Sequence, residues 1–163
     1  RSIAGVLMEE TERYRVPLYP AGGFTSLSLA HQAACFMSAD AGSRPIRVLY
    51  VGDYDPAGVL IDRHIERELR KHLPSAANLT IDRLAVTREQ IDLMGLSTKP
   101  TKDRRARWEG GTVEAEAIPA ATMRAMLRDA IEEHVDQREL EVVLAAEKSE
   151  RDVIFSIAER LES

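Results

Sequence analysis

The chain is poor in several kinds of residue, and each shortage excludes a class of protein. Aromatic residues make up 5% of its 163 residues, which argues against a protein that stacks single-stranded bases on several exposed rings. Its one cysteine cannot form a disulfide within the chain. The net charge is −5, so any contact with nucleic acid needs a local basic patch. No run of residues is long and apolar enough to span a bilayer, and we expect a cytoplasmic protein.

The order of the residue patterns predicts one α/β domain followed by a helix. Hydrophobic residues make up 44% of the chain and charged residues 30%, which is ordinary for a globular protein of this length. Strands that alternate with helices favour an α/β fold, with a Rossmann-like, mostly parallel sheet covered by helices on both faces. The patterns predict extended segments at 16–21, 48–53, 79–86 and 112–118, and helices at 3–14, 25–39, 57–73, 89–94 and 119–134. A charged, amphipathic C-terminal helix is expected over 135–163, after a domain that spans 1–134.

Residues 47–58 carry the strongest indication of chemistry. A continuous apolar run at 48–51 predicts a strand buried on both faces, and it ends in two carboxylates, Asp53 and Asp55. Open α/β sheets bind their ligands at the carboxyl ends of strands. Two carboxylates this close favour a divalent cation, and Mg²⁺ commonly takes one or two carboxylates together with phosphate oxygens. The alternative interpretation is an Asp-rich turn that only caps the next helix.

The segment GDYDPAG at residues 52–58, directly after a hydrophobic strand, resembles the Asp-x-Asp-x-x-Gly signature of the Toprim domain. The form that contains a proline is most similar to the Toprim domain of type IIB topoisomerase A subunits and of the related meiotic double-strand-break proteins. Similar domains occur in small bacterial and phage proteins. Residues 16–26, VPLYPAGGFTS, also resemble the second strand and turn of that group. The resemblance covers roughly residues 1–134.

This resemblance implies a centre for Mg²⁺ or Mn²⁺. Asp53 and Asp55 match the acidic pair of the family, and Gly58 matches the glycine that lets the helix start close to the site. The family's third acid is a Glu at the end of the first strand, and it acts as general acid and base. Because a helix is predicted directly after Arg1, we expect this strand and its catalytic Glu upstream of Arg1. The Asp pair alone is expected to bind metal and phosphate but to catalyse poorly.

A second candidate site is the basic cluster between residues 99 and 107. The predicted phosphate or nucleic-acid contacts are Lys99, Lys102, Arg104, Arg105 and Arg107. Trp108 adds a ring that could stack on a base. The alternative interpretation is a solvated loop that Trp108 anchors to the domain. Elsewhere, Cys35 is expected to lie on a helix and to point into the core. His64 and His72 are both expected on the outer faces of the helix predicted over 57–73.

Two classes of function follow from these patterns. The first is a Toprim-like domain of a larger protein that binds Mg²⁺ and acts on nucleic-acid phosphodiesters, as a nuclease or a topoisomerase-like enzyme. The second is a non-catalytic module that binds metal or nucleic acid within a DNA-processing complex. DNA is the expected partner and a membrane is not. The C-terminal helix is expected either to fold back on the domain or to pair with a second copy or a partner domain.

Overall fold

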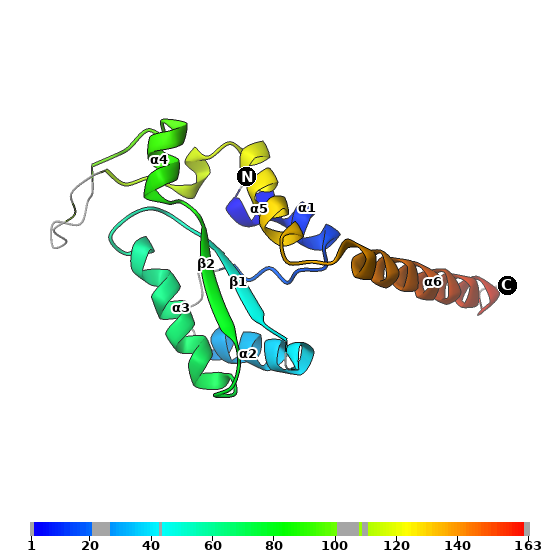
Figure 1. The fold of residues 1–163 in the computed structure, drawn as a ribbon. Coiled ribbons are helices and arrows are strands. Elements are labelled where there is room, and N and C mark those ends of the chain that lie inside the picture. The colour runs from blue at the N-terminus through cyan, green and yellow to red at the C-terminus, as the bar shows by residue number, and fades with distance from the viewer. Residues whose placement is uncertain (1, 21–26, 43, 101–107, 109–110, 162–163) are drawn as a thin grey trace.

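A computed structural model describes residues 2–20, 27–42, 44–100, 108 and 111–161 (Figure 1). The described residues form a mixed α/β structure with six α-helices and one small parallel sheet of two strands. The helices are α1 (Ile3–Arg13), α2 (Leu27–Ala41), α3 (Gly58–His72), α4 (Arg88–Met94), α5 (Ala120–Glu132) and α6 (Gln137–Leu161). The strands are β1 (Ile46–Val51) and β2 (Leu79–Ala85), and a short 3-10 helix, η2, spans Ala115–Ala117.

The two strands pair in parallel, with α3 as the connection between them. Their register runs from Ile46 opposite Leu79 to Tyr50 opposite Arg83, and an irregularity follows between Tyr50 and Val51. Parallel strands cannot be joined by a tight hairpin, so the chain must cross back over the sheet before the second strand begins. This crossover places the start of α3 at the carboxyl end of β1.

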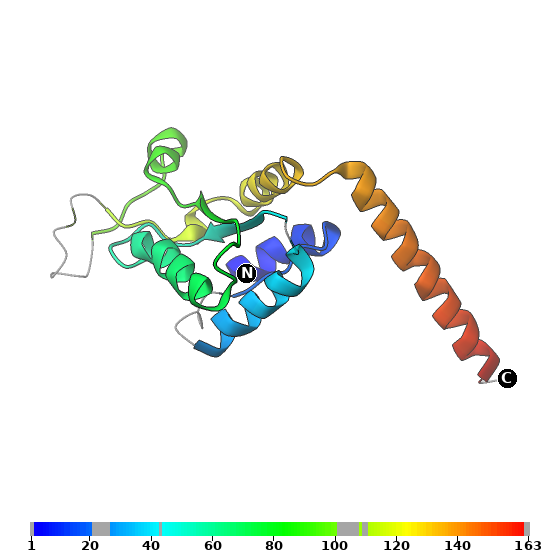
Figure 2. The same ribbon diagram turned by 60° about the horizontal axis from the view of Figure 1, so that its bottom comes forward.

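Helices cover both faces of the sheet, as the apolar run in β1 predicts (Figure 2). Successive side chains of a strand point to opposite faces. Val48 and Tyr50 therefore pack into a core with α2 and α3, whereas Leu49 and Val51 pack into a core with α1 and α5. The buried residues of the α2–α3 core are Ala30, Ala33, Ala34, Tyr50, Ile65, Leu69, Leu73 and Leu79.

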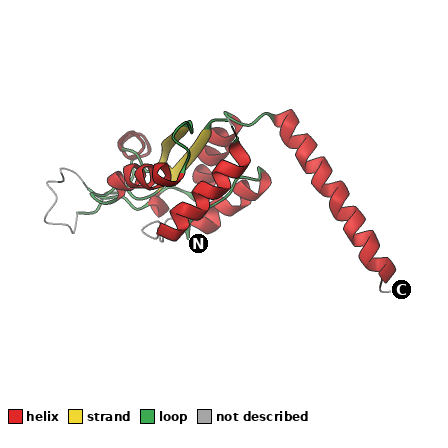
Figure 3. Ribbon diagram, turned by 90° about the horizontal axis from the view of Figure 1, so that it is seen from below, coloured by secondary structure: helices red, strands yellow, loops and turns green. Residues whose placement is uncertain are grey.

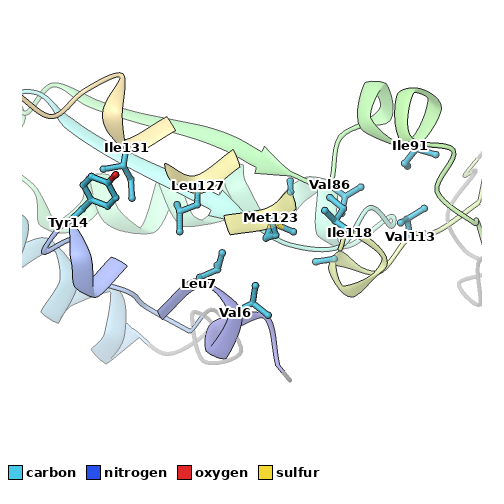
Figure 4. Close-up of a cluster of buried hydrophobic side chains, with 12 residues drawn as sticks. Val6, Leu7, Tyr14, Val86, Ile91, Val113, Ile118, Met123, Leu127 and Ile131 are labelled. Atoms are coloured by element: carbon cyan, nitrogen blue, oxygen red, sulfur yellow. The ribbon is translucent and has the colours of Figure 1, made fainter. Parts of the chain in front are cut away.

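The core between α1 and α5 combines apolar packing with buried polar links. Its side chains include Leu7, Met123 and Leu127 (Figure 4). Arg128 of α5 donates hydrogen bonds to the carboxylate of Glu10, which is only 3% exposed. These bonds hold the pKa of Glu10 below its ordinary value. The Tyr14 hydroxyl donates to Glu132 in the same way, so that the C-terminal end of α1 is joined to α5 at two positions.

Helix α6 projects away from the rest of the molecule (Figure 3). Leu140 packs against the α1–α5 core, and Glu147 forms an ion pair with Arg15 at 2.6 Å. Further along the helix, large apolar side chains such as Ile154 and Phe155 are 67% and 63% exposed. Within the described residues, no helix has the length and apolar character that crossing a membrane requires.

Two of the predicted strands are wrong. Of the strand predicted over 16–21, residue 21 lies outside the described residues, and residues 16–20 have no regular structure, because Pro17 and Pro20 lack the N–H that a ladder needs. In the segment 112–118, Thr112 and Val113 form only isolated antiparallel bridges, and the chain then turns into η2. The described sheet is therefore smaller than the predicted one.

The predicted helices are present, each within about three residues of its expected bounds. Leu60 of α3 is apolar, yet it is 57% exposed. It lies one position away from the buried side of the helix, where Ile65 and Leu69 pack.

Candidate metal centre

The loop at residues 52–57 places Asp53 and Asp55 at the carboxyl end of β1, where the sequence predicts them. Asp53 is exposed and Asp55 is half-buried. One oxygen of each carboxylate is held by the backbone. Asp53 Oδ1 accepts the Ala115 N–H at 2.8 Å, and Asp55 Oδ1 accepts the Gly58 N–H at 2.5 Å. These bonds fix the orientation of both side chains without the help of any cation.

The bond between Asp55 and Gly58 is the one that the capping interpretation predicts. It does not use up the carboxylate. No hydrogen bond or ion pair in the described part of the chain uses the Oδ2 atom of Asp53 or of Asp55. Capping and metal binding are therefore compatible in this loop. The backbone orients one oxygen of each carboxylate, and the second oxygen of each is available to a cation.

Gly58 is the first residue of α3, and its lack of a side chain has a geometric reason. A Cβ atom added there would overlap the carbonyl oxygen of Asp53 and would lie 3.0 Å from Asp55 Oδ1. The residue is also buried. The close start of the helix beside the acidic pair therefore requires glycine, which is the role that the motif predicts for this position.

Arg83 is a second element of this loop, and the sequence patterns do not identify it. It lies near the end of β2 with a side chain that is 14% exposed. Its Nη1 donates to the carbonyl oxygens of Asp53 at 3.3 Å and Val86 at 3.4 Å, and its Nη2 donates to that of Gly58. One guanidinium thus joins both ends of the acidic loop to the neighbouring strand.

Two further contacts hold the Arg83 guanidinium in place. Its Nε forms an ion pair with Asp62 of α3 at 3.3 Å, and its carbon lies 4.9 Å from the centre of the Tyr50 ring. Burial raises the pKa of the Tyr50 hydroxyl, and the Asp53 charge adds to the effect while Arg83 opposes it. Tyr50 is therefore a neutral packing residue at neutral pH. The only signal for Arg83 in the sequence is a charged residue inside a mainly apolar strand.

The segment that begins at Thr112 forms the other wall of the loop. Val113 and Tyr54 exchange backbone hydrogen bonds of 2.8 and 3.0 Å, and the Ala115 N–H then reaches Asp53. Glu114, between them, is exposed and pairs with Lys99 at 3.0 Å. The Lys99 amine, which the sequence predicts to contact phosphate, is thus paired with a carboxylate of the chain itself.

The rest of the predicted basic cluster gives less information. Lys102, Arg104, Arg105 and Arg107 lie outside the described residues. Trp108 is described, and its ring centre lies 5.0 Å from that of Tyr54 while its indole N–H donates to the Gly111 carbonyl at 3.2 Å. These contacts fit the interpretation in which Trp108 anchors the segment beside the acidic loop.

The histidine and cysteine predictions need correction. Cys35 is exposed rather than in the core, because it lies on the outer side of α2, where its sulfur is 3.5 Å from His31 Nε2. His72 is not on an outer face, since its ring makes an edge contact with His31 at 5.0 Å and its Nε2 is buried, with no hydrogen-bond partner among the residues that the structure describes. Across the described residues, no group of three or more His, Cys, Asp or Glu side chains is arranged to hold a metal ion.

Comparison with known proteins found no relative: no family model, no curated protein and no solved structure matches this chain.

Proposed function

We propose that the loop at residues 52–58 is a Mg²⁺ centre in a Toprim-like, Rossmann-type domain that acts on nucleic-acid phosphodiesters. The observation that carries this proposal is the pair of backbone-oriented carboxylates, Asp53 and Asp55, at the carboxyl end of a parallel strand. Two carboxylate oxygens fit a hard cation that completes its shell with water and phosphate oxygens. Mn²⁺ suits the same oxygen ligands.

The chain's own residues orient the site. The Ala115 and Gly58 amides fix the two carboxylates, and Arg83 holds the loop that carries them. When bound, the cation would neutralise the charge that develops on the phosphoryl oxygens as a phosphodiester bond breaks. Moving the proton needs a further group, and the family resemblance implies a Glu in that role. A cytoplasmic location and DNA as the nucleic acid remain predictions.

Titration calorimetry with Mg²⁺ and with Mn²⁺ tests the centre. The Asp53→Asn, Asp55→Asn double variant is expected to lose the binding heat of the unmodified chain. The matched control is Asp92→Asn, Asp129→Asn, which removes the same two charges from exposed positions on α4 and α5. Equal binding by the unmodified chain and the Asp53, Asp55 variant would disprove the metal centre.

The second candidate function is the non-catalytic module. The observation in its favour is that Glu114, next to the Ala115 amide that binds Asp53, is already paired with Lys99. Nicking of supercoiled DNA in Mg²⁺ separates the two functions. An enzyme nicks the plasmid, slowly where the Asp pair acts alone, and the Asp53, Asp55 variant does not, whereas a binding module retains the DNA without cutting it.

A further inference from the structure

Helix α3 has two chemically different faces. Ile61, Ile65 and Leu69 point toward α2 and the sheet and are half-buried or buried. The opposite face carries Arg63, Arg67, Arg70 and Lys71, which we name the α3 basic stripe. Together with Glu66, these side chains line an open hollow of about 400 Å³ on the surface. This concentration of cations is unexpected in a chain whose net charge is −5.

The two ends of the basic stripe differ in how their charge is compensated. Arg70 pairs with Glu66 at 2.8 Å and also donates to the Leu79 carbonyl. Lys71 pairs with Glu68 at 2.8 Å, and this contact lowers the pKa of the Glu68 carboxyl. These carboxylates therefore offset the charge at the C-terminal end of the stripe.

The N-terminal end of the stripe keeps its positive charge. Arg67 is 66% exposed, and its one short contact among the described residues is a hydrogen bond of 2.6 Å to the His64 ring, which adds no negative charge. Its only ion pair among these residues is a long contact of 3.6 Å to Glu68, which Lys71 already neutralises. The side chain of Arg63 is exposed and makes no ion pair or hydrogen bond with the described residues. Two exposed guanidinium groups therefore stand one helical turn apart on the same face.

The position of these groups relates them to the acidic loop. Helix α3 begins at Gly58, and each residue adds about 1.5 Å along its axis. Arg63 thus lies about 7.5 Å from the start of the helix, and Arg67 about 6 Å further. A line of cations leads away from the proposed metal centre, with the spacing of one residue per turn.

We propose that the α3 basic stripe binds the phosphate backbone of the nucleic acid whose phosphodiester reaches the acidic loop, which rests on the function proposed above. Guanidinium groups pair with phosphate oxygens through parallel hydrogen bonds. A row of them on one helix face contacts successive phosphates and carries no base specificity. In an acidic protein, such a local patch also directs the polyanion toward the site rather than to the remaining surface.

Fluorescence anisotropy with a labelled duplex DNA, in EDTA so that no metal takes part, measures this contact. The Arg63→Gln, Arg67→Gln variant is expected to bind several-fold more weakly. Its slope of log affinity against log salt concentration should fall by about two, because each lost phosphate contact removes about 0.9 from the slope. Glutamine is a good helix former, so the fold is retained, and a thermal melt checks this. Arg63→Gln alone serves as a milder variant, since Arg63 supports no described contact.

The matched control is Arg138→Gln, Arg151→Gln, which removes two positive charges from exposed positions on α6. A larger loss for the α3 variant than for this control supports the proposal. Equal losses, or no binding by the unmodified chain at low salt, overturn it. The calorimetric test of Asp53 and Asp55 is independent of this one. If the unmodified chain bound no Mg²⁺, but the Arg63, Arg67 variant still lost DNA affinity, the metal centre would be refuted and the proposal for the basic stripe would stand.

Discussion

The acidic loop and helix α6 are the two regions of the molecule that differ most in how they are held. In the loop, the Asp53 carbonyl and one oxygen of each carboxylate accept hydrogen bonds, and the Gly58 carbonyl at the start of α3 accepts another. In α6, the last ion pair to the body among the described residues is at Glu147, and the apolar side chains beyond it are exposed. The loop is built to hold a geometry, whereas α6 presents a surface.

This difference shows where each kind of function can reside. A site that orients a cation must keep its ligands within a narrow range of positions, and surrounding hydrogen bonds provide this. A surface that meets a partner needs exposed apolar area more than it needs rigidity. We therefore expect substitutions in the loop to lower stability and ligand binding together, and substitutions in the outer half of α6 to leave both unchanged.

The largest effect is expected for Arg83→Met, which removes the guanidinium but keeps a long side chain. The change leaves carbonyls of the loop and the Asp62 carboxylate without their donor, at a cost of about 3 kcal/mol in the free energy of unfolding. Urea unfolding measures this loss. Calorimetry is expected to show Mg²⁺ affinity at least about ten-fold lower, as for groups that orient metal ligands.

Arg88→Met is the control for Arg83→Met. Arg88 is also next to a strand end, but its side chain is 55% exposed and, within the described part of the chain, pairs only with Asp92 one turn along α4. The free energy of unfolding of the Arg88→Met variant should lie within about 0.5 kcal/mol of that of the unmodified chain. Similar stabilities for the Arg83 and Arg88 variants would contradict the special role of Arg83 in the loop.

An intermediate effect is expected for Gly58→Ala. The new methyl group meets the Asp53 carbonyl, so the loop or the start of α3 must move, at a cost of about 2 kcal/mol in the free energy of unfolding. Gly5→Ala is the matched control, because a Cβ in α1 has only the Ser2 hydroxyl nearby, at 3.7 Å. That change should stabilise the chain by about 0.5 to 1 kcal/mol. Destabilisation of equal size in both variants would be evidence against the close approach at Gly58.

The smallest effect on stability is expected in α6, for Ile154→Ser, Ile157→Ser. Both side chains are more than half exposed, so the free energy of unfolding should change by less than about 0.5 kcal/mol. Sedimentation velocity tests the predicted pairing of α6 with a second copy: the unmodified chain is then a dimer and the variant a monomer. A large loss of stability in the variant would show instead that this half of α6 packs against the body.

The sequence predicts well those features that depend on neighbouring residues. The strand before Asp53 and the helix that begins at Gly58 follow from local patterns. The start of α4 is equally local, because Thr87 and Gln90 form a reciprocal pair of hydrogen bonds there. The position of Asp53 and Asp55 at the strand end follows in the same way. Their use as metal ligands remains a prediction.

Features that depend on distant partners were not accessible from these patterns. Alternating residues at 112–118 resemble a strand, but the partners of Val113 and Ala115 are Tyr54 and Asp53, which no local pattern reveals. The same holds for Arg83, because its side chain can reach the Asp53 carbonyl only once β2 lies beside β1. Cys35 was assigned to the core from its apolar neighbours, yet the helix phase that exposes it depends on which side of α2 meets α3.

The hydrogen bond between the Ala115 amide and Asp53 joins residues 62 positions apart. Closing a loop of that size has an entropic cost that must be met before the contact contributes any stability, and contacts of long sequence separation slow folding. We therefore expect Asp53 to reach its final orientation late, after the segment that begins at Thr112 has packed beside the loop, whereas Asp55 is oriented by its near neighbour Gly58. A fragment that ends before Thr112 would still contain the whole Asp-x-Asp-x-x-Gly motif, but Asp53 would have lost the amide that orients it.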